Sequence, residues 1–171
     1  PPTPSGATPL PQALIAGRPV MWVDNCSTDR PFVAALREVL QSMAPSATSA
    51  VLLLNGPCNP TGAALGEAEL REVATLCREH HVVVLSDEIY SLTRFPDAGR
   101  HRSIAEFYPE GTIISNGISK WAGCGGYRLG MLSFPSELSH WGDAAAVVAS
   151  ETFTSVSTPV QHAGVAAFEA D

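Results

Sequence analysis

Short apolar runs rich in β-branched residues alternate along the chain with longer amphipathic stretches. Because most positions in each run are apolar, and not only every second one, we expect both faces of the resulting sheet to be buried. Strands bounded by turn residues and separated by helical stretches are typical of an α/β fold. The predicted strands are residues 20–23, 51–54, 82–86, 112–115 and 129–134.

The amphipathic stretches predict helices at residues 31–43, 67–80, 137–149 and 156–169. Proline lies in the first turn of two of them, at Pro31 and Pro159. At that position its missing N–H has no helical partner to lose. Residues 98–110 show neither the helical nor the strand periodicity of apolar positions, which predicts a loop with one short helical turn.

The two ends of the chain differ from its middle. Residues 1–11 contain five prolines together with Ser, Thr and Gly, which predicts a linker without a core of its own. Residue 1 is Pro and not Met, and the last helical stretch runs almost to Asp171. We therefore expect a segment of a longer protein, with a linker at 1–11 and part of one domain at 12–171.

Composition narrows the classes of partner. With 171 residues, of which 45% are hydrophobic and 16% charged, the chain can bury a core. A net charge of -7 without any run of basic residues disfavours nucleic acid and anionic membranes as partners. The four cysteines are widely spaced without a C-x-x-C pair, which is typical of reduced thiols. We expect a cytoplasmic protein.

Side chains able to bind a ligand follow three of the predicted strands. Asn59 follows the second strand, Asp87 and Tyr90 follow the third, and Lys120 and Arg128 follow the fourth. Open α/β sheets bind their ligands just beyond the carboxyl ends of the strands. We therefore expect these five residues to lie at one edge of the sheet.

Lys120 is the only lysine of the chain, since the other nine basic residues are arginines. A guanidinium does not form the Schiff bases that a lysine amine forms with carbonyl groups. The five residues supply an amine for an aldehyde, a carboxylate for a pyridinium nitrogen, an amide and a phenol for a phenolate oxygen, and a guanidinium for a phosphate. Each residue alone is typical of an ordinary turn or surface, but the combined set matches pyridoxal phosphate.

Three motifs follow one another in the chain: Asn-Gly-Pro-Cys-Asn-Pro-Thr-Gly at 55–62, Ser-Asp-Glu-Ile-Tyr at 86–90, and Ser-Lys at 119–120 followed by Gly-Tyr-Arg-Leu-Gly at 126–130. With these motifs, the chain resembles the fold type I pyridoxal-phosphate enzymes, specifically the class I and II aminotransferases related to aspartate aminotransferase. The resemblance covers about residues 10–168. It implies a mostly parallel sheet with flanking helices, in three α/β/α layers, as the central part of the cofactor-binding large domain.

The resemblance also implies a role for each site residue. Lys120 would hold pyridoxal phosphate as a Schiff base and then act as general acid and base. Asp87 would pair with the pyridine nitrogen, Asn59 and Tyr90 would hydrogen-bond the 3′ oxygen, and Arg128 would bind the phosphate. The implied reaction is transamination between an L-amino acid and a 2-oxo acid in a homodimer.

Several departures from the family pattern accompany the resemblance. Many relatives carry Ser or Thr three residues before the lysine, where it helps to hold the phosphate, but this chain has Gly117. Ser115 and Ser119 are candidates to replace that hydroxyl. The N-terminal phosphate loop, the aromatic residue that stacks on the ring and the small domain have no counterpart in this sequence. We therefore expect the chain to be inactive alone.

Two alternatives stay open. The same lysine and aspartate also serve β-lyases, decarboxylases and cyclopropane-forming synthases, which only substrate-facing residues would distinguish. A non-catalytic domain that senses the cofactor in a regulator, or a degenerate remnant, is the second alternative. A remnant should have lost Asp87, Lys120 or Arg128, and all three are present.

Other chemistries find no support in the motifs. Residues 123–128 carry Arg128 where a dinucleotide fingerprint needs glycine, and residues 117–121 end in Trp121 where a hydrolase elbow needs glycine. The histidines show no metal-ligand spacing. We expect neither a nucleotide nor a metal.

Overall fold

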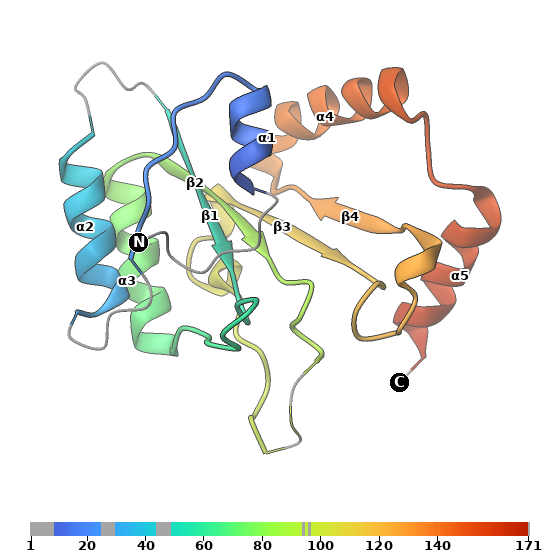
Figure 1. The fold of residues 1–171 in the computed structure, drawn as a ribbon, viewed down its shortest axis with the longest axis horizontal. Coiled ribbons are helices and arrows are strands. Elements are labelled where there is room, and N and C mark those ends of the chain that lie inside the picture. Colours follow the sequence, from blue (N-terminus) through green and yellow to red (C-terminus); the bar gives the residue numbers. More distant parts are fainter. Residues whose placement is uncertain (1–8, 25–29, 44–48, 94, 96, 171) are drawn as a thin grey trace.

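The structure is a computed structural model that describes residues 9–24, 30–43, 49–93, 95 and 97–170. Its centre is a four-stranded sheet with the strand order β1-β2-β3-β4 (Figure 1). β1, β2 and β3 are parallel, and β4 runs antiparallel to β3. The predicted α/β class, with a mostly parallel sheet and flanking helices, is confirmed. The strands are β1 (Ala50–Asn55), β2 (Val82–Asp87), β3 (Thr112–Gly117) and β4 (Gly130–Ser133).

Five α-helices and several single 3₁₀ turns surround this sheet among the described residues. Each of the four predicted helices is present within a few residues of its expected range. None of the described helices combines the length and apolar character that crossing a bilayer requires. The helices are α1 (Pro9–Ile15), α2 (Phe32–Gln41), α3 (Glu67–Glu79), α4 (Ser139–Thr152) and α5 (Thr158–Glu169), and the 3₁₀ turns are η1 (Ile104–Glu106), η2 (Pro109–Gly111), η3 (Gly125–Tyr127) and η4 (Ser136–Leu138).

Helix α1 was not expected from the sequence. The last three residues of the proline-rich segment 1–11 begin this helix, and residues 1–8 lie outside the described part of the chain. Leu14 and Ile15 near its end are 64% and 88% exposed. The helix therefore adds little to the core.

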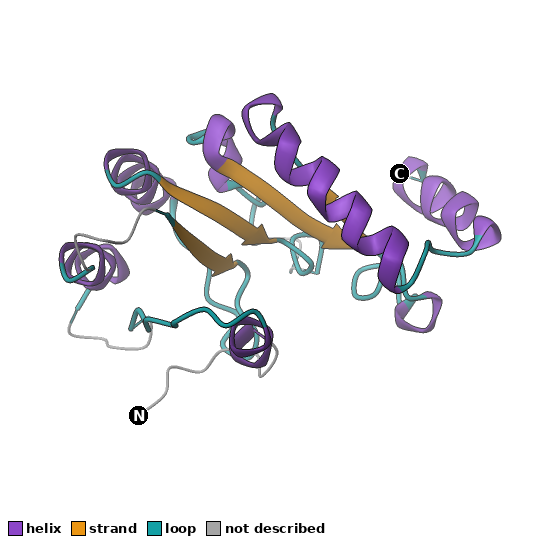
Figure 2. Ribbon diagram, turned by 90° about the horizontal axis from the view of Figure 1, so that it is seen from above, coloured by secondary structure: helices purple, strands orange, loops and turns teal. Residues whose placement is uncertain are grey.

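The main core lies between the sheet and two helices. α2 and α3 pack side by side on one face of the sheet (Figures 1 and 2). Leu36 of α2 and Leu76 of α3 meet Val82 and Val84 of β2, and all four side chains are almost fully buried. Cys77 of α3 is also in this core, and its burial raises the pKa of the thiol to about 12.

One predicted strand is absent. Residues 20–23 form no strand, and Val20, Met21 and Trp22 are 37%, 49% and 44% exposed. β1 is the edge strand of the described sheet, and residues 20–23 do not pair with its free edge, so their N–H and C=O groups take part in no ladder. The apolar run shows that these residues are hydrophobic, but it does not show whether they pair with another strand.

The expectation that both faces of the sheet are buried is wrong for the outer strands. Val51 and Leu53 of β1 are 52% and 41% exposed, and Met131 and Leu132 of β4 are 43% and 50% exposed. α2 and α3 cover the face of β1 that carries Ala50, Leu52 and Leu54. The continuous apolar run of β1 therefore has one face in the core and one face toward solvent.

The register of the strands brings three loops to one edge of the sheet. Asn55 is the partner of Asp87 in the β1–β2 ladder, and Asp87 is the partner of Ser115 in the β2–β3 ladder. β4 begins at the same edge because Gly130 pairs with Gly117. The loops that follow β1, β2 and β3 therefore leave the sheet close together, as the sequence predicts.

We expect Leu76→Ala to lower the free energy of unfolding by about 2–5 kcal/mol, because it opens a cavity in this core. Leu14→Ala is the matched control, since Leu14 is 64% exposed. It should change the free energy of unfolding by less than about 0.5 kcal/mol. Urea denaturation followed by circular dichroism measures both, and equal losses for the two variants would contradict this location of the core.

Candidate active site

Asn55 joins the ends of β1 and β2. Its Nδ2 donates hydrogen bonds to the backbone oxygen of Asp87 at 3.1 Å and to Asp87 Oδ2 at 3.2 Å. Its Oδ1 accepts a hydrogen bond from the backbone N–H of Asn59 at 2.9 Å. Sequence reasoning assigned Asn55 no role. Its place as the first residue of the 55–62 motif, at the end of a strand, was the available signal.

A compact turn carries Asn59. The N–H of Gly62 donates to the oxygen of Cys58 at 2.7 Å, and the N–H of Cys58 donates to the oxygen of Ala63 at 2.8 Å. Gly62 has a φ of 72°, a conformation that residues with a side chain rarely adopt. The turn thus holds Asn59 above the ends of the strands.

Asn59 and Tyr90 line the same surface hollow. This hollow has a volume of about 210 Å³ and contains residues from the loops after β1 and β2. The side chain of Asn59 is exposed and that of Tyr90 is half-buried. The remaining lining residues are Pro57, Cys58, Pro60, Gly62 and Thr93.

Asp87 ends β2 with a half-buried carboxyl group. Burial raises the pKa of this carboxyl above its ordinary value, the N–H of Ile89 opposes the rise through a long hydrogen bond to Oδ1 (3.4 Å), and the charge of Glu88 adds to it. No described basic side chain forms an ion pair with Asp87. Its carboxylate is therefore suited to bind a protonated nitrogen of a ligand.

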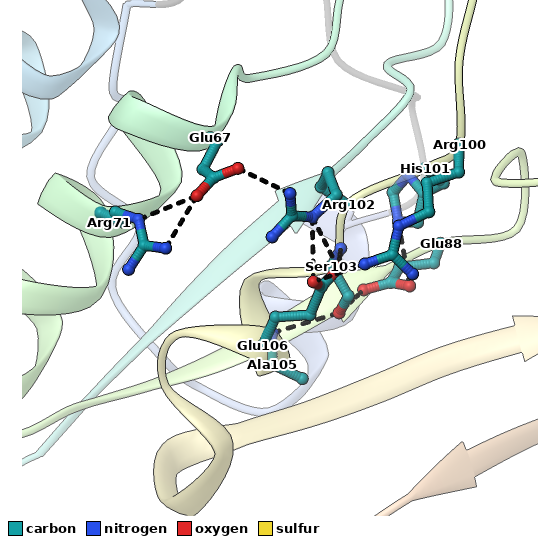
Figure 3. Close-up of polar contacts among 9 residues, drawn as sticks. All are labelled: Glu67, Arg71, Glu88, Arg100, His101, Arg102, Ser103, Ala105 and Glu106. Atoms are coloured by element: carbon teal, nitrogen blue, oxygen red, sulfur yellow. Dashed lines mark hydrogen bonds and ion pairs between the residues drawn. The ribbon is translucent and has the colours of Figure 1, made fainter.

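Glu88, the residue after Asp87, is buried in a polar cluster (Figure 3). Its Oε1 accepts hydrogen bonds from Ser86 Oγ at 2.9 Å and from Ser103 Oγ at 2.5 Å. His101 Nε2 lies 3.1 Å from Glu88 Oε2, which is within the distance of an ion pair, although this contact does not have the geometry of a hydrogen bond. Burial tends to raise the pKa of Glu88, but the contacts with His101, Ser103 and Ser86 outweigh burial and lower the pKa.

Ion pairs continue this cluster toward α3 (Figure 3). Arg102 Nη1 lies 2.6 Å from Glu67 Oε2 in the first turn of α3, and Arg102 Nε lies 2.9 Å from Glu106 Oε2. Arg71 and Arg102 also lie over the ring of Phe107, at 4.5 Å and 5.3 Å from its centroid. Exposed ion pairs contribute little singly, but together these contacts attach the segment after Tyr90 to α3.

The loop after β3 carries Lys120. Trp121 Nε1 donates a hydrogen bond to the oxygen of Gly117 at 2.8 Å, and the Trp121 ring lies 5.2 Å from the ring of Phe168 on α5. Lys120 is exposed, and its Nζ lies 5.6 Å from the centroid of the Tyr90 ring. The fold therefore brings Lys120 and Tyr90 together, although thirty positions separate them in the sequence.

Arg128 is placed differently from the other predicted site residues. It has a φ of 56°, in the left-handed region that a residue with a side chain seldom adopts. Its Nη1 donates a hydrogen bond to the oxygen of Gly125 at 2.8 Å, within its own loop. In the described part of the chain, no hydrogen bond or ion pair joins it to the other four residues.

Gly117 is explained by a close approach of β4. A Cβ atom at this position would lie 2.7 Å from the backbone oxygen of Leu129 and 3.2 Å from the Cα of Gly130. A serine or threonine would therefore not fit without moving the backbone. Ser115 and Ser119 are half-buried, and neither hydroxyl forms a hydrogen bond with another described residue.

The residues described above fit the ring of pyridoxal phosphate better than they fit its phosphate group. A half-buried carboxylate without a described basic partner suits a protonated ring nitrogen, and the hollow formed by the loops after β1 and β2 contains an amide and a phenol. Lys120 supplies an amine next to that phenol. The guanidinium of Arg128 is bound to its own loop and would have to rotate to reach a phosphate.

Comparison with known proteins gives consistent matches. The family model described as Aminotransferase class I and II matches residues 17–171. An aspartate aminotransferase of Geobacillus stearothermophilus is 32% identical over 170 residues, which is 98% of this chain and 42% of that protein. A crystal structure of an aromatic aminotransferase from Pyrococcus horikoshii OT3 has a TM-score of 0.86 at 32% identity, over 99% of this chain and 44% of that chain.

A second curated relative, an aspartate aminotransferase of Pyrococcus abyssi, is 42% identical over 87 residues, which cover 50% of this chain and 22% of that protein. Aspartate aminotransferase from Thermotoga maritima has a TM-score of 0.83 at 26% identity, over 98% of this chain and 43% of that chain. The chain thus spans less than half the length of each of these proteins.

We expect Ser103→Ala to destabilise the fold in a pH-dependent way. The pKa of Glu88 is lowered in the fold, so its contribution to stability is present above the unfolded pKa and is lost as the pH falls through the folded pKa. Removing the Ser103 hydroxyl should cost about 1–3 kcal/mol at about pH 7 and less at about pH 3.

Ser136→Ala is the matched control, because Ser136 Oγ also donates to a carboxylate, that of Glu137, but both residues are exposed. Urea denaturation at the two pH values measures both variants. A loss for Ser103→Ala that does not change with pH would contradict the assignment to Glu88.

We expect Gly117→Ala to lower the free energy of unfolding by about 1–3 kcal/mol, because its Cβ would overlap the backbone of β4. Gly126→Ala is the control in the neighbouring turn, where no atom lies within 4 Å of the added Cβ. It should change stability by less than about 0.5 kcal/mol. If thermal unfolding shows the two variants to be equally stable, the close approach of β4 is not a constraint.

Proposed function

The chain belongs to the class I and II aminotransferase family, and on that premise we propose that it is the cofactor-binding part of an enzyme that transfers an amino group between an L-amino acid and a 2-oxo acid. The observation that carries the proposal is the convergence of Asp87, Asn59, Tyr90 and Lys120 on one edge of the sheet. The residues between β1 and β4 would therefore supply the polar groups that contact the edge of the cofactor ring, but not the aromatic side chain that stacks on its face.

Pyridoxal phosphate, when bound, supplies an electron sink for the pair left behind when the substrate Cα proton departs. Lys120 is the residue that would hold the cofactor covalently through its amine. Asp87 would bind the ring nitrogen and keep it protonated, and Asn59 and Tyr90 would donate hydrogen bonds to the phenolate oxygen. Once a substrate amine has displaced it, Lys120 would take the proton from the substrate Cα and deliver it to the C4′ atom of the cofactor.

The proposed phosphate ligand is Arg128, the first arginine after Lys120 in the sequence. Its Nη1 is bound to the oxygen of Gly125. Exchange of that single hydrogen bond for a bidentate contact with phosphate favours rotation of the side chain when a ligand is present. Ser115 and Ser119, whose hydroxyls form no bond with described residues, are the candidates to complete the phosphate contacts that Gly117 does not supply.

The amino-acid specificity is left open by the relatives. Proteins similar to this chain are named for aspartate, for aromatic amino acids and for N-acetyl-LL-diaminopimelate, at 32–36% identity. Because the chain spans less than half of their length, the side-chain specificity, a homodimeric assembly and a cytoplasmic location are part of the proposal. Transamination is favoured over β-lyase or synthase chemistry because each of these relatives is named an aminotransferase.

We expect borohydride reduction of the chain in the presence of pyridoxal phosphate to fix the cofactor on Lys120. Lys120→Arg keeps the positive charge but removes the primary amine, so it should abolish the fixation. Peptide mapping by mass spectrometry locates the label, and circular dichroism verifies that the variant is folded. Fixation that survives in Lys120→Arg, or no fixation in the unsubstituted chain, would contradict the proposed role.

A further inference from the structure

Asn55 uses its whole side-chain amide in contacts around the candidate site. An asparagine amide offers two N–H donors and one acceptor oxygen. The Nδ2 group donates to the backbone oxygen and to the carboxylate of Asp87, and Oδ1 accepts the N–H of Asn59. The orientation of the amide is therefore fixed, because the reversed amide would place its oxygen against the carboxylate and its NH₂ group against an N–H donor.

The two neighbours of Asn55 belong to different segments of the chain. Asp87 closes β2, whereas Asn59 lies in the turn that follows β1. The backbone supports the same junction, since the N–H of Gly56 donates to the oxygen of Asp87 at 3.2 Å. Asn55 provides the side-chain link from the turn to the carboxylate itself.

The Asp87 carboxylate has few other contacts that fix its orientation. Oδ1 receives only the long hydrogen bond from Ile89 at 3.4 Å, whereas Oδ2 receives the hydrogen bond from Asn55 at 3.2 Å. The carboxylate of an aspartate can turn about the χ1 and χ2 torsions unless a donor holds one of its oxygens. The donor that holds Oδ2 is the same amide that holds the Asn59 turn.

We propose that Asn55 is a positioning residue that fixes the Asp87 carboxylate relative to the Asn59 turn, and so sets the spacing between the groups that would bind the ring nitrogen and the phenolate oxygen of pyridoxal phosphate. The inference rests on the proposed function for the identity of the ligand. We call the hydrogen bonds from the Asn55 side chain to Asp87 and from the Asn59 N–H to Asn55 the Asn55 bracket. These hydrogen bonds can be measured without any ligand.

Two substitutions of similar size separate the two ends of the bracket. Asn55→Leu removes both the donor and the acceptor. Asn55→Asp keeps an oxygen to accept the Asn59 N–H but places a second carboxylate against Asp87. Val82→Ala is the stability-matched control, because it opens the core at the other end of β2, about 16 Å from Asp87 along the strand.

The first measurement is made on the unsubstituted chain by nuclear magnetic resonance. The side-chain NH₂ protons of Asn55 should shift with pH at the same midpoint as the Asp87 carboxyl carbon. In Asn55→Leu, the pKa of Asp87 should rise by about one unit because a donor to the charged form is lost. In Val82→Ala, the pKa of Asp87 should not change.

Amide hydrogen exchange tests the other end of the bracket. Exchange at the Asn59 N–H should become about tenfold faster in Asn55→Leu, relative to the neighbouring amides. It should stay close to that of the unsubstituted chain in Asn55→Asp. The response of the Asn55 NH₂ protons to the titration of Asp87 is measured without a substitution, so a variant that fails to fold does not remove the test.

The outcomes distinguish this inference from the proposed function. If the Asn55 NH₂ protons do not follow the titration of Asp87, or if Asn55→Leu leaves the pKa of Asp87 unchanged, the inference is overturned whether or not the cofactor binds. If both effects are observed but pyridoxal phosphate is not fixed on Lys120, the bracket is supported and the proposed function is contradicted.

Discussion

The parallel register of β1, β2 and β3 is the constraint on which the rest of the structure depends. It pairs Asn55 with Asp87 and Asp87 with Ser115, so that three loops leave the sheet at one edge. Side chains alternate between the two faces of a strand, and a slip of one residue would move Asp87 to the face that α2 and α3 cover. Val82 and Val84 fill that face, and their burial against the helices therefore sets the face on which Asp87 lies.

The two adjacent carboxyl groups at the end of β2 are placed in contrasting environments. Glu88 receives two serine hydroxyls and the close contact of His101, and its pKa is lowered. Asp87 faces neutral donors only, and its pKa is raised. When the pKa values of two neighbouring carboxyl groups are shifted in opposite directions, the two groups are suited to different roles. Glu88 is already satisfied and holds the chain in place, whereas Asp87 still gains from a cationic partner.

The sequence was sufficient to predict β1 to β4, the four longer helices and the edge of the sheet where the site residues lie, because each depends on periodicity or on local turn residues. The prediction of a strand at residues 20–23 was wrong, because an apolar run does not show whether its residues pair with a neighbouring strand. The contact of Asn55 with Asp87, thirty-two positions away, and that of Glu88 with Ser103 depend on register and on the path of a loop. The close approach that requires Gly117 depends on β4, and a single sequence carries none of this information.

A continuous series of contacts joins four of the five predicted site residues. Asn55 connects Asp87 to the turn of Asn59, Asn59 and Tyr90 share one hollow, and Lys120 lies over the ring of Tyr90. The fifth, Arg128, is held by its own loop in a left-handed conformation. If the chain binds pyridoxal phosphate as proposed, the four residues for the ring would need little rearrangement, whereas Arg128 would have to give up its hydrogen bond to Gly125 to reach the phosphate.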